Sequence, residues 1–197
     1  MNYWTIQNKK VIDIVKEAGE YYPDFRLSPN KKMELNYKCA LKVFNKNNGS
    51  QFAGLIFCFA HDVANGFQSF EEVKLFLKNY PTLKEFIKYD ASDAFSNAFS
   101  VLELSSYPEN INTTPIDIAY FTMLDDIKND YGFDGLHFVD TDKNTLSAER
   151  VEKMLKTWEK GKYSGPFVSF SESNILQHHL PYIKKDNIKG IYKASDL

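Results

Sequence analysis

The chain has 197 residues, of which 15% are aromatic and 25% charged, and its formal net charge is −2 at neutral pH. This composition excludes a disordered chain, because large apolar groups are abundant. It also excludes an overall positive field that would recruit nucleic acid or an anionic membrane. A chain of this length buries about 70% of its surface on folding, which is enough for one complete core. We therefore expect a single domain over residues 1–197.

The first half of the chain predicts a strand, two amphipathic helices and a second strand. A strand is expected at 3–6, and a helix follows it that Asn8 caps and Gly19 ends. The buried face of this helix should carry Val11, Ile14, Val15 and Ala18. After an aromatic loop at 21–27, a helix should begin at Ser28–Pro29 and end near 47–50. Its buried face should carry Tyr37, Ala40, Leu41 and Phe44. The apolar run at 55–59 is typical of a buried strand.

The rest of the chain mixes strands and helices without a regular alternation. Two capping boxes, Ser69 with Glu72 and Thr82 with Glu85, predict helix starts. A further helix should run from Pro115 to about Gly132, and another lies around 151–158. Strands are expected at 99–104, 136–139, 167–170, 175–183 and 188–192. The pattern predicts an α+β fold with a small, mostly antiparallel sheet, or sheets, flanked by amphipathic helices.

Sequence signals for cellular location are negative. No apolar run reaches the roughly 18–20 residues of a membrane span, and the first residues lack the charged and apolar regions of a signal peptide. The two cysteines, Cys39 and Cys58, lie within apolar patterns, which is typical of a reducing compartment. We therefore expect a cytoplasmic protein.

Arginine is scarce, since only Arg26 and Arg150 stand among the 24 basic residues. Arginine is the side chain best suited to bidentate recognition of phosphate and of bases. We therefore expect no sequence-specific DNA binding. A bound phosphate group would have to be held by lysines or backbone amides.

The sequence gives little support for a metal site or for a common catalytic motif. The run 140–144 resembles the start of a calcium loop, but Thr145 and Val151 replace the Gly and Glu that such a loop needs, so a turn is expected there. The four histidines lack the paired spacing of a zinc site, and we expect no metal. A nucleophile formed by Cys58 with His61 is disfavoured by the apolar flanks of Cys58, which indicate a core cysteine.

Two groups of residues stand out as candidate binding groups. Tyr21, Tyr22, Tyr107 and Tyr182 lie beside polar residues and could form a stacking platform for a ring, or simply pack against the body. In the segment 173–183, a strand would place Gln177 and His179 on one face and His178 on the other. Such a pair could hydrogen-bond a ribose or orient a nucleophile. The alternative is an edge strand with one solvent-exposed face.

Three segments together resemble known proteins. They are Trp4–Gln7 before an amphipathic helix, 101–120 with its Tyr107–Pro108, and 176–188 with its Gln-bearing strand. These segments resemble a bacterial domain family of unknown function that opens with Trp-Thr-Ile-Gln. They are similar, more distantly, to the ADP-ribosyltransferase superfamily, and Gly132–Leu136 is similar to a strand entry of toxin-type transferases.

The resemblance implies a fold in which small sheets form a cleft for the cofactor NAD. It further implies that Thr5 and Gln7 on the first strand contact NAD, that Trp4 or Tyr107 stacks on the nicotinamide, and that Gln177 takes the late-strand catalytic position with His179 beside it. The superfamily's usual glutamate is absent there, and a glutamine cannot act as a base. If the resemblance holds, Thr5, Gln7 and Gln177 should line one cleft.

Three functional hypotheses remain open. The first is an ADP-ribosyltransferase-like enzyme that modifies a protein or nucleic-acid acceptor, in the role of a toxin, phage or defence factor. The second is a non-catalytic interaction or inhibitor domain that binds a protein partner through its aromatic loops. The third is a nucleotide- or RNA-processing enzyme that uses His178 or His179 as an acid or base.

Overall fold

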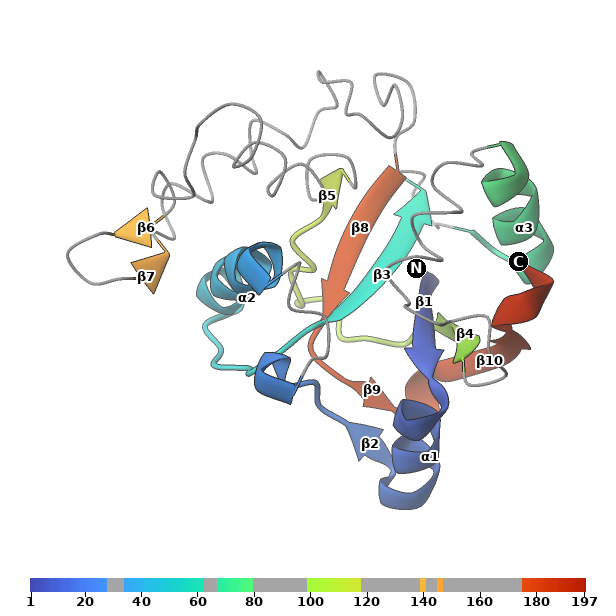
Figure 1. Cartoon of the computed structure of the whole chain (residues 1–197), viewed down its shortest axis with the longest axis horizontal. Coiled ribbons are helices and arrows are strands. Elements are labelled where there is room, and N and C mark those ends of the chain that lie inside the picture. The colour runs from blue at the N-terminus through green and yellow to red at the C-terminus, as the bar shows by residue number, and fades with distance from the viewer. Residues whose placement is uncertain (28–33, 62–66, 80–98, 118–138, 141–144, 147–174) are drawn as a thin grey trace.

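A six-stranded antiparallel sheet forms the centre of the structure, in the order β10-β4-β1-β3-β8-β5 (Figure 1). This computed structural model describes residues 1–27, 34–61, 67–79, 99–117, 139–140, 145–146 and 175–197. The strands are β1 (Tyr3–Asn8), β3 (Ile56–His61), β4 (Phe99–Leu104), β5 (Ile116–Asp117), β8 (Ile175–Leu180) and β10 (Ile188–Lys193). The predicted α+β class is confirmed.

Two small two-stranded sheets accompany the main one. β2 (Glu20–Tyr21) pairs with β9 (Ile183–Lys184), and β6 (Val139–Asp140) pairs with β7 (Thr145–Leu146). Short 3-10 helices occupy Phe25–Leu27, Lys185–Asn187 and Ala194–Asp196. The turn predicted in place of a calcium loop falls on residues 141–144, which lie outside the described residues.

Local capping signals position the helices as predicted. Before α1 (Lys9–Ala18), the Asn8 Oδ1 accepts a hydrogen bond of 2.9 Å from the Lys10 N–H, and Gly19 ends the helix at a φ of 84°. Before α3 (Phe70–Asn79), the Ser69 hydroxyl accepts from the Glu72 N–H at 3.2 Å. α2 spans Glu34–Asn48, and its predicted start at 28–29 lies outside the described residues.

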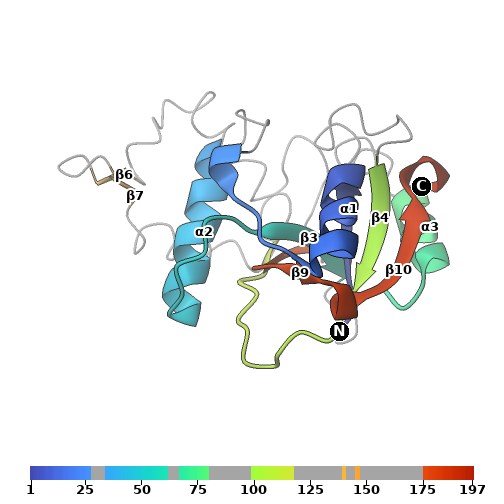
Figure 2. The ribbon, with the colours of Figure 1, turned by 90° about the horizontal axis from the view of Figure 1, so that it is seen from below.

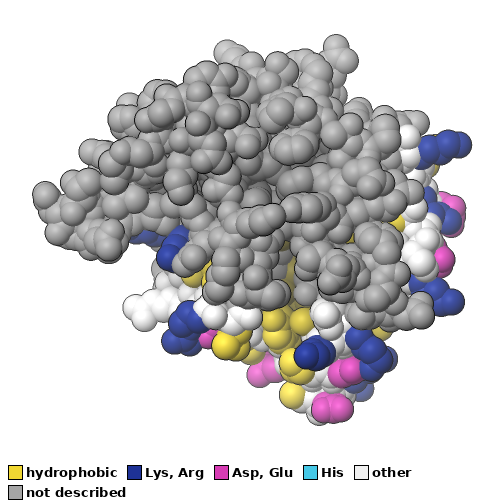
Figure 3. Space-filling model, in the orientation of Figure 1, with side chains coloured by type: hydrophobic (Ala, Val, Ile, Leu, Met, Phe, Trp, Pro, Cys, Tyr) yellow, Lys and Arg dark blue, Asp and Glu magenta, His cyan; other side chains and the backbone are white. Residues whose placement is uncertain are grey.

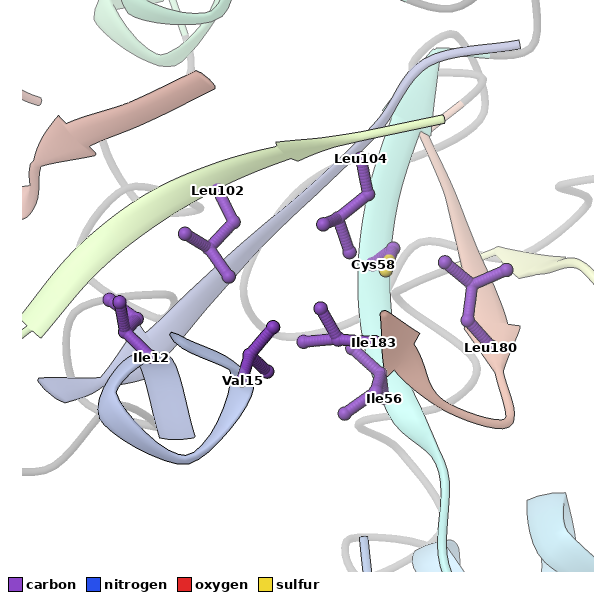
Figure 4. Packing of buried hydrophobic residues seen from close by; sticks show 8 residues of the cluster. All are labelled: Ile12, Val15, Ile56, Cys58, Leu102, Leu104, Leu180 and Ile183. Atoms are coloured by element: carbon purple, nitrogen blue, oxygen red, sulfur yellow. The ribbon is translucent and has the colours of Figure 1, made fainter. Parts of the chain in front are cut away.

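One face of the sheet is covered by α1, and we call it the α1 face. Eight buried side chains form its core, as Figure 4 shows: Ile12, Val15, Ile56, Cys58, Leu102, Leu104, Leu180 and Ile183. The prediction that Ile14 and Ala18 are buried is wrong, because Ala18 is exposed and Ile14 is 42% exposed. Ile14 lies two residues from Ile12, about 200° around the helix, whereas Val15 lies three residues from it and shares its stripe.

The other face, which we call the opposite face, is packed by α2 and α3. The Trp4 ring stacks on Phe70 of α3, with 6.3 Å between ring centroids, and Phe70 in turn stacks on Tyr192 at 4.5 Å. Tyr37 of α2 packs on Phe57 at 4.7 Å. Of the residues predicted to be buried on α2, Tyr37, Ala40 and Phe44 are buried and Leu41 is partly buried. Figure 2 shows α2 at one end of the sheet and α3 at the other, beside β10.

The helix predicted from Pro115 is wrong at its start. Ile116 and Asp117 form the strand β5, which pairs with β8 at Gln177 and Leu176. Pairing with β8 provides hydrogen-bond partners for the backbone of β5, and a local sequence signal for a helix contains no information about such a distant strand. The remaining predicted elements at 82–85, 118–132, 136–138, 151–158 and 167–170 lie outside the described residues.

At the end of the strand order, β10 is irregular. Its register against β4 shifts between Ile188 and Gly190, as in a β-bulge. A Cβ atom at Gly190 would lie 2.7 Å from the Tyr192 ring, so a larger residue there would displace that ring. The Tyr192 hydroxyl donates a 3.1 Å hydrogen bond to the buried Glu103 carboxylate. β10 is therefore bent and fixed to the opposite face through Tyr192.

The buried Asn187 joins the β9–β10 turn to the end of β4. Its Oδ1 accepts from the Lys184 N–H at 3.0 Å. Its Nδ2 donates to the backbone carbonyls of Ser105 and Ser106 at 3.1 and 3.3 Å. A side chain that both donates and accepts is therefore required at this position.

Asn187→Asp should destabilise the protein by about 2–4 kcal/mol, because a buried carboxylate would face two carbonyl oxygens and donate to neither. Urea denaturation measures this loss. The matched control is Asp186→Asn on the exposed neighbour, which should stay within about 0.5 kcal/mol of the parent protein. Equal stability of the two variants would contradict the role given to Asn187.

Candidate functional site

Three consecutive polar side chains lie buried in the middle of β8. Gln177, His178 and His179 are 6%, 6% and 1% exposed. The predicted alternation is confirmed: His178 contacts Tyr3 on the α1 face, and His179 contacts Phe57 on the opposite face. Gln177 is on the same face as His179, since its Nε2 lies 3.1 Å from the His179 Nε2. The two histidines therefore cannot share one ligand or ion.

His179 is held by the backbone of the loop that precedes β5. Its Nδ1 lies 2.9 Å from the Thr114 carbonyl oxygen and 3.2 Å from that of Thr113. The His179 backbone N–H also donates to the Thr113 carbonyl, at 2.9 Å. Burial lowers the pKa of the imidazole to about 4, so His179 is neutral at physiological pH.

His178 has a different environment on the α1 face. Its Nδ1 lies 2.7 Å from the Thr113 hydroxyl, and its ring meets the Tyr3 ring at 5.4 Å in an edge-on arrangement. The His178 Nε2 is buried and has no hydrogen-bond partner within the described part of the chain. Burial lowers the pKa of this imidazole to about 4 as well.

A network of asparagines fixes the loop that carries the two threonines. The Asn48 side chain of α2 donates to the Asn112 carbonyl at 2.8 Å and accepts from the Asn112 N–H at 2.8 Å. The Asn112 Oδ1 then accepts from the Thr114 N–H at 2.9 Å. Thr114 has a φ of 44°, a left-handed conformation that is unusual for a β-branched residue. The loop is therefore strained locally and held from both sides.

Sequence reasoning missed this loop entirely. Thr113 and Thr114 carry no motif, and their role depends on contact with β8, more than 60 residues away. The one available signal was Asn112, because asparagine often hydrogen-bonds to the backbone two residues later in a turn.

Trp4 and Gln177 lie in one row across the opposite face. Trp4 pairs with Phe59 of β3, and Phe59 pairs with Gln177 of β8. Residues that pair directly across antiparallel strands point to the same face, so Trp4 and Gln177 are two strands, or roughly 10 Å, apart on that face. Trp4 is 0% exposed, and its Nε1 donates to the Phe67 carbonyl at 3.0 Å. Its ring is thus part of the core.

Thr5 and Gln7 lie on the α1 face, because they alternate with Trp4 along β1. The Thr5 hydroxyl donates to the Phe57 carbonyl at 2.7 Å, and the Gln7 Nε2 donates to the Thr5 hydroxyl oxygen at 2.9 Å. The prediction that Thr5, Gln7 and Gln177 line one cleft is therefore wrong. The resemblance placed them by position along each strand, and the register between strands separates them.

Tyr107 belongs to a cluster of four tyrosines, which we call the tyrosine cluster. Ring centroids follow one another at 5.9 Å from Tyr3 to Tyr107, 5.6 Å to Tyr182 and 5.6 Å to Tyr22. The Tyr107 hydroxyl donates to the Tyr182 carbonyl at 2.8 Å, and burial raises the pKa of Tyr107. Tyr3 and Tyr107 pack against the core of the α1 face. Tyr107 is thus on the other side of the sheet from Gln177.

Cys58 is a core residue, as its flanks indicated. It is 1% exposed and faces His178 across the β3–β8 pair. Burial raises the pKa of the thiol, so it stays protonated and is a poor nucleophile. Among the described residues, no group of three His, Cys, Asp or Glu side chains could hold a metal ion.

Comparison of the chain with protein-family models, with curated proteins and with solved structures gives no match. None of the helices within the described ranges is both long and apolar enough to cross a membrane.

The two histidines predict a loss of stability in mild acid. Their pKa values of about 4 lie below the ordinary 6.5, so the unfolded chain takes up protons first as the pH falls. Their contribution is complete above about pH 6.5 and is lost between there and about pH 4. From pH 7.5 to 5, each histidine should cost about 2 kcal/mol, measured by urea denaturation.

His178→Phe is the informative variant for this pH dependence, because it keeps a planar ring and removes one titrating group. Its stability loss between about pH 7.5 and 5 should be close to half that of the parent protein. An unchanged loss would show that His178 does not take part.

Proposed function

We propose that the chain is an ADP-ribosyltransferase-like protein that binds NAD beside Gln177 and modifies a protein or nucleic-acid acceptor. In this proposal it serves as a toxin, phage or defence factor. The proposal does not include the first-strand contacts that the resemblance implied, because Thr5 and Gln7 lie on the other face of the sheet from Gln177. The observation that supports it best is the fixed amide of Gln177. A buried glutamine held by a neutral histidine, in one row with Trp4, is suited to orient a hydroxyl-bearing ligand.

The residues on the face of Gln177 fit a ribose better than a phosphate. An amide can hydrogen-bond a ribose hydroxyl without needing a charge. A phosphate would favour arginine, and Arg26 is exposed and already paired with Asp24 through its guanidinium. Arg150 lies outside the described residues, and in this proposal lysines or backbone amides hold the NAD pyrophosphate. Bound NAD would supply the chemistry, namely a ribose–nicotinamide bond that can be cleaved.

Gln177 and His179 orient and do not move protons. The amide of Gln177 has no basic group. The His179 imidazole has a pKa of about 4, and its Nε2 already contacts Gln177. In this proposal Gln177 orients the ribose and His179 is a positioning residue. The hypothesis that His179 replaces the missing glutamate as a base therefore loses support, as does the third hypothesis of a histidine acid or base.

Gln177→Met should weaken NAD binding about tenfold, because methionine keeps the length of the side chain and removes the amide. Calorimetry measures the Kd, and transfer of labelled ADP-ribose to lysate with nicotinamide release measures activity. Gln51→Met, on an exposed glutamine, serves as the control and should bind as the parent protein does. If the parent protein neither binds NAD nor releases nicotinamide, the proposal is lost.

The tyrosine cluster supports a second candidate function, a non-catalytic domain that binds a protein partner. Tyr22 is 47% exposed at the end of the cluster, and Lys184 lies 5.0 Å from the centre of the Tyr182 ring. Exposed tyrosines backed by packed rings are typical of binding surfaces. On the described surface in Figure 3, basic and acidic side chains are interspersed, which favours a protein over a nucleic acid as the partner.

Tyr22→Ala should reduce recovery of a stoichiometric partner in a pull-down at least tenfold while leaving NAD binding unchanged, because the Tyr22 ring contacts Phe52 and Tyr182 rather than Gln177. Leu27→Ala, at an 81% exposed side chain, is the control. Absence of any stoichiometric partner with the parent protein would count against this second function.

A further inference from the structure

We infer that the carbonyls of Thr113 and Thr114 fix the proton of His179 on Nδ1, and that this fixes Gln177 so that its site accepts a hydrogen bond from a ligand hydroxyl or N–H group and disfavours an anion. The ligand part of this inference rests on the proposed function. The part that concerns His179 and Gln177 does not.

The first step follows from what a carbonyl can do. A carbonyl oxygen only accepts hydrogen bonds, so the two carbonyl contacts to the His179 Nδ1 require a proton on that nitrogen. The Thr114 hydroxyl, 3.1 Å from the same nitrogen, can accept as well as donate and is compatible with that proton. A neutral imidazole carries one proton, which leaves a lone pair on Nε2. The backbone thus selects one tautomer of His179.

The second step concerns the orientation of the Gln177 amide, which follows from this tautomer. The His179 Nε2 can only accept, so the group 3.1 Å from it must be the NH₂ of the Gln177 amide. The amide cannot rotate by 180° without placing its oxygen against a lone pair. The Gln177 Oε1 is therefore oriented away from His179, and it accepts no hydrogen bond from any residue that the structure describes.

The third step concerns the ligand. A carbonyl oxygen at a buried position attracts a donor and repels the oxygens of a phosphate or carboxylate. Hydroxyl groups of a sugar, or the amide of nicotinamide, are donors of the required kind. The specificity of the site therefore depends on the tautomer of a residue that need not touch the ligand.

The strained loop helps to maintain the tautomer of His179 and the orientation of the Gln177 amide. Thr114 adopts a φ of 44° and directs its carbonyl at His179, while its N–H donates to the Asn112 side chain. Strained backbone persists where neighbouring contacts determine it fully, and it is often found at functional sites. Asn112 and Thr114 are thus positioning residues for Gln177.

Nitrogen-15 NMR of the imidazole rings in the full chain tests the first two steps without any ligand. His179 should show a protonated Nδ1 and an unprotonated Nε2 at neutral pH. The variant His178→Phe lacks the signals of His178 and so distinguishes them from those of His179. Thr114→Val, which keeps the carbonyl and removes the hydroxyl, should leave this tautomer unchanged. Asn112→Ala, at an exposed residue, should allow the second tautomer to appear. A protonated Nε2 in the parent protein would overturn the inference.

Calorimetry with NAD and with NAD that lacks one hydroxyl of the nicotinamide ribose tests the third step. The parent protein should lose about tenfold in affinity for one of the two deoxy analogues, and Gln177→Met should not distinguish them from NAD. If the parent protein binds NAD and both analogues equally, the ligand assignment fails while the proposed function stands. If NAD does not bind at all, the proposed function fails, and the NMR result still decides the polarity of Gln177.

Discussion

The need to satisfy three adjacent polar side chains inside one strand determines much of this structure. An unpaired polar group costs free energy when it is buried, so Gln177, His178 and His179 need hydrogen-bond partners. The Gln177 amide has one within the strand, the His179 Nε2, whereas the Nδ1 atoms of the two histidines need partners from outside it. The loop before β5 supplies them, with a hydroxyl for His178 and carbonyls for His179. That loop must in turn be held, and α2 holds it through Asn48. The sheet, the loop and the helix therefore depend on one another.

The aromatic residues form two groups that meet where Tyr22 stacks on Phe52, which packs against the buried side chains of α2. The tyrosine cluster packs against the α1 face through Tyr3 and Tyr107, whereas Trp4, Phe57 and Phe70 pack on the opposite face. The two candidate functions depend on different groups. The proposed NAD site and the proposed partner surface are nevertheless connected through ring contacts, Tyr3 with His178 and Tyr22 with Phe52.

Much of the fold was predictable because its signals are local. The caps at Asn8, Gly19 and Ser69 act within a few residues of the helices that they begin or end. Strand β5 was mistaken for a helix start because its partner lies 60 residues away in β8. The strand predicted at 175–183 is broken between β8 and β9, where Pro181 cannot donate to a ladder.

The candidate site was predictable only in part. Alternation alone correctly placed Gln177 with His179 and apart from His178. Whether Thr5 or Trp4 shares the face of Gln177 depends on the register of β1, β3 and β8, which no single segment encodes. The threonine carbonyls that orient His179 are backbone atoms, so the identity of their side chains could not reveal them.

The irregular strand β10 has a consequence for the behaviour of the protein in a crowded solution. The outer strand of a sheet can act as a template onto which another chain adds, and this is a common beginning of aggregation. Here the register shift at Gly190 twists that strand, and Lys189 and Lys193 place charge along it. The same glycine that accommodates the Tyr192 ring therefore also makes the edge strand β10 a poor template for pairing with a neighbouring molecule.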